Sequence, residues 1–394
     1  MIMNNALSLI VFFFVVFLLP PVLHGQEKTI NILYTGGMKG QLEPCGCSPK
    51  TDFGGLARLS GFLAAHGKGL SPYVLVDAGN FSPEDTPQGR LKVDAMLKSF
   101  GIMNYDAVAF MLDEQAFPDI FIASRINEYA IPVLSHQSPF NQTISIARDD
   151  FIINVGVGPA SSTEGELAVL LTDHPHSALE STTGWDVVIS SSGEELEDPV
   201  KVKDTVFVSG YPRGEKLGIL TLRFDEKERV KSFHHTWVPL GSDVEEDPGV
   251  RDVLDEYNAK TARLYAESER PPAGDTYLSV ARCAECHQLF EESWKKTRHA
   301  AALASLEQVG KSGDPECIIC HVVGFGEKGG FFSMETTPEL ANVQCEECHG
   351  LDREHVNDYS RPMKPVTGEV CLKCHTKENS PDFDYALYLK KIIH

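Results

Sequence analysis

The chain has 394 residues, of which 42% are hydrophobic, so it is long enough to bury more than one core and two domains are expected. It carries 35 basic and 56 acidic residues, and the resulting net charge of -21 argues against nucleic acid or an anionic membrane surface as a partner. Redox partners with a basic docking surface suit this charge better.

The N-terminal sequence MIMNNALSLIVFFFVVFLLPPVLHGQ contains an apolar run from Ala6 to Leu19 that two prolines end. This run is too short for a comfortable bilayer span and is typical of a secretory signal peptide. We therefore assign residues 1–25 to a signal peptide and expect export to the periplasm or the extracellular space. Because no lysine or arginine precedes the run, an uncleaved membrane anchor is the alternative.

Residues 26–247 alternate short apolar runs with turns and helical stretches. The runs include INILYTGG, YVLVDAGN, YDAVAFML, WDVVISSS, TVFVSGYP and KLGILTLRFD. Such runs are typical of buried strands whose ends carry loops, and they predict an α/β domain built as a layered sandwich. Function in such folds is carried by the loops.

These strands, with the segments LEPCGC and GGLARL, resemble the metallophosphoesterase domain of the 5'-nucleotidase family. The resemblance implies a dinuclear metal site at the strand ends, made by Asp-x-His, Gly-Asp, Asn-His and Gly-His-x-His motifs. Hydrolysis by that machinery needs His and Asp ligands around two cations. At the matching positions this chain has Gly37 and Lys39, Asn80, Leu112 and Asp113, and Ser192 and Glu194.

We therefore predict a metallophosphoesterase-like domain without metal ligands and without phosphoesterase activity. Asn80, Asp113 and Glu194 remain candidates for binding one hard cation. Cys45 and Cys47, in EPCGCS, could form a strained, redox-active disulfide across Gly46. Two free thiols, a metal site and an intermolecular link are the alternatives.

Residues 248–274 read as a connector, with a helical pattern from Pro248 to Glu267 followed by a Pro-Pro-Ala-Gly break. Residues 275–394 then form a second domain. It contains the pentapeptides CAECH, CIICH, CEECH and CLKCH, each with the spacing Cys-x-x-Cys-His. An exported protein could use such cysteines in disulfides, and a zinc site could use the paired cysteines, but neither reading explains the histidine that follows every pair.

Haem attachment accounts for the spacing of the motif, because two thiols three positions apart can add to the vinyl groups of a haem and the adjacent histidine can ligate the iron. We predict four covalently bound c-type haems. They leave only about 30 residues each, so the macrocycles would form the core of this domain. The attachment residues are Cys283, Cys286, Cys317, Cys320, Cys345, Cys348, Cys371 and Cys374, and the proximal ligands are His287, His321, His349 and His375.

Two further histidines, His299 and His355, are candidates for distal ligands. If Ala284 to Leu306 is one helix, His287 and His299 lie roughly 18 Å apart along its axis. Axial ligands of one iron are only about 4 Å apart, so His299 would serve a different haem. An ordinary core or solvated histidine is the alternative reading of both.

The segments CAECHQLFEESWKKTRHAAALASL, ECIICHVVGFGEKGGFF and VQCEECHG resemble the tetrahaem cytochrome c-554 family. This resemblance implies a mainly α, haem-packed domain in which His299, His355 and a late histidine are distal ligands. The candidate for the late histidine is His394. The implied axial pairs are His287 with His355, His349 with His394, and His375 with His299.

The resemblance leaves the haem of His321 without a second histidine, and so with an open position for a small ligand such as nitric oxide. Met334, Met363, His66 or His136 could instead supply a sixth ligand. We expect an electron carrier between redox partners with a non-catalytic docking domain. The alternatives are a reductase or binder of a small nitrogen oxide, and a structural subunit, as a homo-oligomer or within a larger redox assembly.

Overall fold

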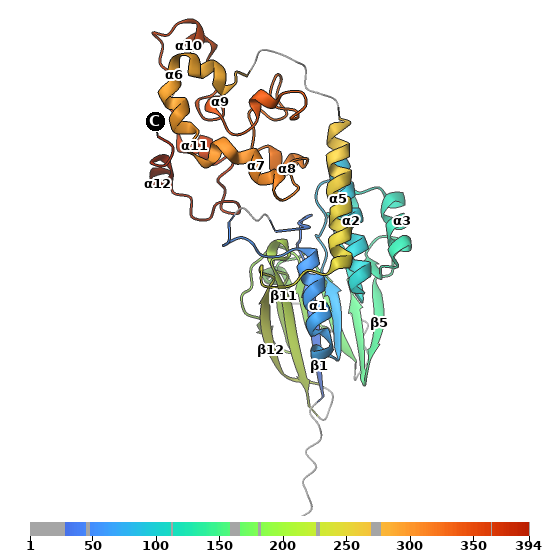
Figure 1. Ribbon diagram of the computed structural model, residues 1–394. Coiled ribbons are helices and arrows are strands. Elements are labelled where there is room, and N and C mark those ends of the chain that lie inside the picture. Colours follow the sequence, from blue (N-terminus) through green and yellow to red (C-terminus); the bar gives the residue numbers. More distant parts are fainter. Residues whose placement is uncertain are drawn as a thin grey trace, which may run out of the picture.

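The computed structural model describes residues 28–44, 48–111, 113–157, 166–179, 183–225, 229–268, 277–363 and 365–393. The proposed signal peptide, the Cys45–Cys47 segment, Leu112, the end of the linker and His394 lie outside these residues. An α/β region occupies one end of the molecule and a mainly helical region the other, with one long helix running between them (Figure 1). We call them the front region and, after the family that its motifs resemble, the cytochrome region.

Two mixed six-stranded sheets form the front region. In the first, β1 to β4 run parallel and β11 and β12 extend the sheet antiparallel beside β1. Its order is β12-β11-β1-β2-β3-β4, with β1 (Thr29–Thr35), β2 (Tyr73–Asp77), β3 (Ala107–Phe110), β4 (Val133–Ser135), β11 (Lys216–Phe224) and β12 (Val230–Pro239).

The second sheet has the order β5-β6-β7-β8-β10-β9. Strands β6, β7, β8 and β10 are parallel, and β5 and β9 pair antiparallel at the edges. Its strands are β5 (Thr143–Arg148), β6 (Phe151–Gly156), β7 (Leu167–Thr172), β8 (Val187–Ser190), β9 (Val200–Val202) and β10 (Thr205–Ser209).

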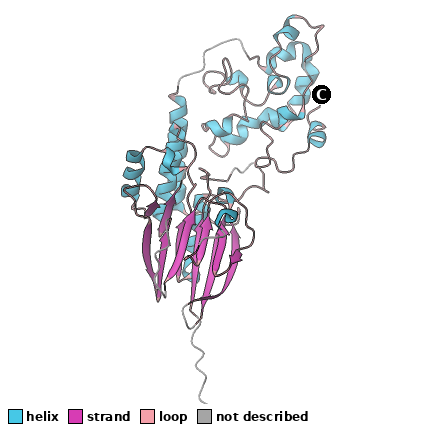
Figure 2. Ribbon diagram, turned by 180° about the vertical axis from the view of Figure 1, so that it is seen from behind, coloured by secondary structure: helices cyan, strands magenta, loops and turns pink. Residues whose placement is uncertain are grey.

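Alternate residues of β1 face opposite sides of the first sheet, as the two-residue period of a strand requires. Ile30, Ile32 and Tyr34 join the core between the two sheets, whereas Leu33 packs toward the helices. Those helices are α1 (Leu56–Leu70), α2 (Pro87–Met103), α3 (Asp119–Tyr129) and α5 (Pro248–Ala266). The layers are therefore helices, sheet and sheet, which confirms the predicted layered α/β fold (Figure 2).

Helix α5 begins as its sequence predicts, because Asp247 accepts a hydrogen bond from the Val250 amide at 2.9 Å and Pro248 occupies the first turn. The predicted helix ended one residue later, at Glu267. Val250, Val253 and Leu254 are buried in the front core, so α5 stabilises the front region and also connects it to the cytochrome region.

Short helices and turns build the cytochrome region. They are α6 (Val280–Trp294), a 3-10 turn (Arg298–Ala301), α7 (Ala302–Glu307), α8 (Pro315–Ile318), α9 (Cys345–His349), α10 (Arg353–Asn357), α11 (Gly368–Cys371) and α12 (Tyr385–Leu389). None of the helices in the described part of the chain is long and apolar enough to cross a membrane.

The assumption of one helix from Ala284 to Leu306 is wrong. Helix α6 is distorted at His287 (φ −118°, ψ 43°) and ends at Trp294. Thr297 then adopts an extended conformation, and its hydroxyl donates to the Trp294 carbonyl at 2.7 Å. The axial distance between His287 and His299 therefore cannot be taken from one helix, and the positions of both rings come from the tertiary structure.

Candidate haem-binding site

The four Cys-x-x-Cys-His motifs lie on four short helical segments. CAECH lies in α6, CEECH is the whole of α9, and CIICH and CLKCH begin at the ends of α8 and α11. Residues three positions apart on a helical turn face the same way, so both thiols of a motif can reach one macrocycle. None of the eight cysteines of the motifs forms a disulfide.

The motifs are neighbours in a fixed order. Cys283 donates a hydrogen bond to Cys345 and lowers the pKa of Cys345, which joins the first motif to the third. Likewise, Cys374 donates a hydrogen bond to Cys320 and lowers the pKa of Cys320 to about 7, which joins the second motif to the fourth. Burial raises the pKa of Cys348 to about 11, and the neighbouring Cys371 adds to this rise. The spatial order is therefore first, third, fourth and second.

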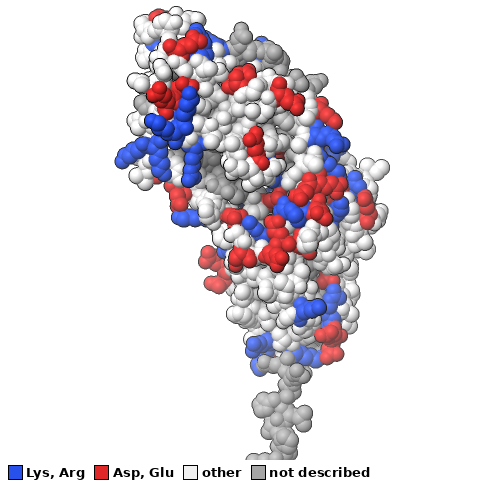
Figure 3. All heavy atoms as spheres, viewed as in Figure 1, with Lys and Arg blue, Asp and Glu red and all other residues white. Residues whose placement is uncertain are grey.

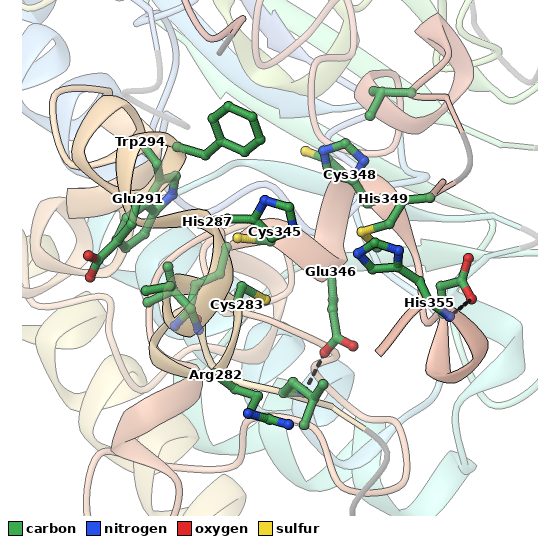
Figure 4. A pocket seen from close by; sticks show the side chains of 18 of the residues that line it. Arg282, Cys283, His287, Glu291, Trp294, Cys345, Glu346, Cys348, His349 and His355 are labelled. Carbon is green, nitrogen blue, oxygen red and sulfur yellow. Dashed lines mark hydrogen bonds between the residues drawn. The ribbon is translucent and has the colours of Figure 1, made fainter. Parts of the chain in front are cut away.

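A cavity of about 600 Å³ lies between α6, α9, α10 and α12. Its volume falls in the usual range for cofactor pockets, which are mostly apolar with a few polar groups. Trp294, Val343 and Leu389 supply part of the apolar wall. Figure 4 shows the sulfur atoms of Cys283, Cys345 and Cys348 and the rings of His287, His349 and His355 around this space.

Two pairs of histidine rings are brought together from distant parts of the chain. The ring centroids of His287 and His355 are 5.9 Å apart, and those of His299 and His375 are 6.2 Å apart. Two imidazoles on opposite sides of one metal ion, each bound at about 2 Å, have centroids roughly 6 Å apart. Both spacings fit the axial pairs that the resemblance implies.

Backbone carbonyls orient two of the candidate ligand histidines, His321 and His355. Nδ1 of His321 lies 2.6 Å from the carbonyl oxygen of Ala302, and Nδ1 of His355 is hydrogen-bonded to the carbonyl oxygen of Arg361. Each contact requires Nδ1 to donate its proton, which leaves Nε2 as the available metal-binding nitrogen. The residues present therefore fit haem iron as well as they fit the porphyrin.

The second ring pair is held in its neutral form. Burial, and to a smaller degree the neighbouring His375, lower the pKa of His299, and burial lowers the pKa of His375. Neutral imidazole is the form that binds a metal ion. Phe383 stacks on His375 with ring centroids 4.8 Å apart and limits the movement of that ring.

The remaining two proximal histidines have different surroundings. His349 lines the cavity described above, and its expected partner His394 lies outside the described residues. No other histidine ring of the described chain pairs with His321. Of the four proposed sixth ligands, Met363 lines the cavity of the first and third motifs, Met334 is half exposed, and His66 and His136 are exposed in the front region.

The loops that would carry a dinuclear metal site in the front region leave one edge of the first sheet, after β1, β2 and β3. The ammonium group of Lys39 pairs there with the carboxylate of Asp113. Glu194 instead accepts a hydrogen bond from the His176 amide at 2.7 Å, and Asn80 donates its side-chain amide to the Ser191 carbonyl at 3.2 Å. The three candidate cation ligands thus each have a different partner within the protein.

No group of three or more His, Cys, Asp or Glu side chains is arranged to hold a metal ion in the part of the chain that the structure describes. Gly37 donates its amide to the Gly79 carbonyl at 2.9 Å, so the first and second loops are joined through their backbones. Ser192 accepts a hydrogen bond from the Glu194 amide at 3.3 Å, which closes its own loop.

Two buried carboxyl groups beneath these loops were missed by the sequence analysis. Asp77 accepts hydrogen bonds from the Thr35 hydroxyl at 2.6 Å and from the Gly79 amide at 2.8 Å, and burial raises its pKa to about 7. Glu114 accepts bonds from the amides of Asn80, Ser82 and Met111, and burial raises its pKa as well. Asp77 ends an apolar strand, which is the one signal the sequence offers.

Residues 282–350 match the family model described as cytochrome c554 and c-prime. Among curated proteins, the chain is similar to cytochrome c-554 of Nitrosomonas europaea, with 36% identity over 95 residues that make up 20% of this chain and 40% of that protein. The chain thus spans less than half the length of this relative. The match confirms the resemblance predicted for the C-terminal third, and this family implies covalently bound c-type haem.

Among solved structures, a 5'-nucleotidase precursor from Thermus thermophilus superimposes with a TM-score of 0.51 at 15% identity, over 72% of this chain and 68% of that one. The sulfate thiohydrolase SoxB from the same organism superimposes with a TM-score of 0.50 at 14% identity, over 68% of this chain and 67% of that one. At these identities the likeness shows the fold alone, and it confirms the fold predicted for the front region.

Proposed function

Since the C-terminal region contains a cytochrome c554 domain and the N-terminal region has the fold of 5'-nucleotidases, we propose that the protein carries electrons between redox partners through four c-type haems. The observation that carries this proposal is the convergence of four Cys-x-x-Cys-His motifs with two further histidines, His299 and His355. Haem iron supplies one-electron redox chemistry when bound. The protein supplies the ligands, their orientation and an apolar wall.

The arrangement of the motifs supports a continuous path. Neighbouring thiols join the first motif to the third, the third to the fourth, and the fourth to the second. His287 with His355 and His375 with His299 are proposed as axial pairs, and His349 with His394 as a third. Ligation by two histidines gives lower potentials than ligation by histidine and methionine, which suits a carrier at the reducing end of a chain.

The front region is proposed to act as a non-catalytic docking domain. It holds the segment that leads into the CIICH motif, since Lys311 is hydrogen-bonded to Glu43 and Arg251 binds the same carboxylate at 2.6 Å. Although burial acts in the opposite direction, these two cations lower the pKa of Glu43. Lys92 pairs with Glu316 at 2.6 Å in the same contact area.

Export is part of the proposal and is supported by the apolar N-terminal run of residues 6–19. Haem would then be attached in the periplasm or the extracellular space, and the redox partners would be found there too. Fractionation of cells that express the full chain tests this directly, because a cytoplasmic haem protein would contradict it.

A second candidate function is favoured by the surroundings of His321. Because no second histidine ring of the described chain faces it, its iron is proposed to keep an open position for a small ligand. Reduction or binding of a small nitrogen oxide would take place there. An electron-paramagnetic-resonance spectrum should contain one high-spin haem that changes with nitric oxide, and a wholly low-spin, unresponsive spectrum would exclude this candidate.

The electron-carrier proposal is tested by haem content and redox titration. We expect a pyridine haemochrome assay to find four haems per chain that stay bound after denaturation, because each motif forms two thioether bonds. We expect all four to be reduced and reoxidised reversibly. Three haems or fewer in fully matured protein would contradict the assignment of the four motifs.

A further inference from the structure

Basic side chains concentrate around one pair of histidines. Figure 3 shows lysine and arginine atoms gathered on the edge of the cytochrome region formed by α11, α12 and the end of α6. Each of these side chains is exposed. We call this surface the basic face, and it consists of Lys295, Lys296, Arg298, Lys373, Lys377, Lys390 and Lys391.

Ring contacts hold the three segments of the basic face together. The segment with Lys296 ends at His299, whose ring centroid is 6.2 Å from that of His375. His375 lies in turn 5.6 Å from the ring of Tyr388. The ammonium group of Lys391 is 4.2 Å from the centroid of that tyrosine ring. The basic side chains therefore surround the histidines proposed to ligate a single haem, the one attached at the fourth motif.

Most of these charges are not neutralised within the protein. Among the described residues, no acidic side chain forms an ion pair with Lys296, Arg298, Lys373, Lys377 or Lys390. Lys295 pairs with Glu291 at 2.7 Å. Front-region cations such as Arg58, Arg148 and Arg251 are paired.

Glu378 is an exposed carboxylate beside Lys377, while two other nearby carboxylates are engaged elsewhere. Asp384 caps α12 by accepting a hydrogen bond from the Leu387 amide at 2.9 Å. Asp382 pairs with Lys50 of the front region at 2.8 Å. A surface that keeps several exposed cations beside one haem ligand pair, within a chain of net charge -21, is suited to recognise a molecule of opposite charge.

We propose that the basic face is a docking surface for an acidic electron-transfer protein, which exchanges electrons with the haem attached at Cys371 and Cys374. This inference rests on the proposed function. The net charge of the whole chain predicts a basic partner, and the basic face adds an acidic one. Because charges are screened beyond about 8 Å at physiological ionic strength, a partner docked on this face interacts with its lysines and not with the distant acidic residues.

The test uses the full haem-loaded protein and a plant-type ferredoxin, a small acidic protein whose low potential makes it an electron donor to haem. The variant Lys373→Glu/Lys377→Glu reverses two charges of the basic face. The matched control, Lys68→Glu/Lys201→Glu, makes the same change of net charge at two exposed front-region lysines without ion pairs. Stopped-flow absorbance gives the rate of haem reduction, and calorimetry gives binding of oxidised ferredoxin.

At about 50 mM salt we expect the basic-face variant to be reduced roughly tenfold more slowly than wild type and to bind ferredoxin more weakly, because steering charges raise association rates by about 10- to 1,000-fold. The control should stay within about twofold of wild type, and all three should converge at about 500 mM salt. A neutral variant, Lys373→Gln/Lys377→Gln, should be reduced at a rate between those of wild type and the charge-reversed basic-face variant. Equal slowing by both charge reversals, or no binding of ferredoxin to wild type, would overturn the proposal.

Gel filtration separates this proposal from self-association. A wild-type dimer that the basic-face variant abolishes would assign the basic face to a second copy of this chain and overturn an acidic redox partner. The haem count and the dithionite-reduced spectrum distinguish failure of the docking proposal from failure of the proposed electron-carrier function. If all variants carry four reducible haems and differ in no rate, the docking surface is refuted while the electron carrier stands.

Discussion

The front region and the cytochrome region bury their side chains in different ways. In the front region, helix α2 alone contributes eight buried residues, and two extensive apolar cores lie on either side of the first sheet. In the cytochrome region, α6 has 15 residues and none of them is buried by other parts of the chain. Its apolar core is one small cluster around Leu303, Ile318 and Phe331.

The two regions therefore depend on different sources of stability. Isolated helices of about 15 residues are marginal in water, and most helices in proteins are stabilised by packing of an apolar face. The front region provides that packing itself. Helix α6 carries the first haem motif, so we expect its stability to come from the group attached to Cys283 and Cys286, by the coupling of cofactor binding to folding.

The largest expected effect follows from removing the attachment sites. Replacing all eight motif cysteines by serine should leave the front region folded and the cytochrome region without stable tertiary structure. Limited proteolysis should then trim the chain near the end of α5, at about residue 268, and circular dichroism should lose part of its helical signal. The matched control is the double change Cys45→Ser/Cys47→Ser, which should leave both regions intact. A protease-resistant cytochrome region in the protein without the eight motif cysteines would remove the contrast between the two regions.

A change of one distal histidine sharpens the contrast within the cytochrome region. His299→Ala should convert one haem to the high-spin state, because the ring opposite His375 is lost. His355→Ala should do the same at the haem of His287. Electron paramagnetic resonance counts the high-spin haems, and His174→Ala is the control, since that side chain is exposed in the front region and is not a candidate ligand. Unchanged low-spin spectra in both variants would show that these histidines are not ligands.

The front region should respond to loss of a buried carboxyl group without any change at the haems. Glu114 accepts hydrogen bonds from three backbone amides. Glu114→Ala leaves these amides unsatisfied and should lower the free energy of unfolding by about 3 kcal/mol, whereas Glu114→Gln should cost less. Urea unfolding followed by tryptophan fluorescence measures the loss. The haem spectrum should stay as in wild type, and a parallel shift of both signals would mean that the two regions unfold together.

The pH dependence of the front region tests Asp77. Burial raises its pKa from 3.8 to about 7, so between these values the folded state holds a proton that the unfolded state has lost. Folding stability should therefore be highest below about pH 4 for this group and should fall as pH rises toward about 7. Asp77→Asn should flatten this part of the curve while wild type keeps the slope. Equal slopes in the two proteins would show that Asp77 does not titrate there.

The smallest expected effect is the absence of phosphoesterase activity. With Lys39 paired to Asp113 and no His at the matching positions, we expect no hydrolysis of nucleotides or p-nitrophenyl phosphate with added manganese, zinc or calcium. An active 5'-nucleotidase assayed in parallel is the control. Metal-dependent turnover above the rate without enzyme would contradict a non-catalytic front region.

Haem attachment was predictable because its chemistry is local. Two thiols and a histidine within five residues, as in Cys283 to His287, satisfy the covalent requirement in any fold that forms one helical turn. The α/β class was predictable for a similar reason, since short apolar runs such as INILYTGG are typical of buried strands, and β1 is indeed buried on both of its faces.

Local sequence patterns did not decide which distant groups meet. The pairing of His299 with His375 was predicted through the family resemblance, and the tertiary structure shows how the chain brings the two rings together. Helix α6 ends at Trp294, and this break directs His299 toward His375 across 76 positions of sequence, although the sequence pattern favours a continuous helix. Burial of Asp77 and Glu114, the pairing of Lys39 with Asp113, and the gathering of lysines from three segments into the basic face depend equally on the path of the chain. The periodicity of a sequence predicts which neighbours of a residue lie on the same face of its own helix or strand. Contacts between remote segments depend instead on the path of the whole chain between them and on how its elements pack.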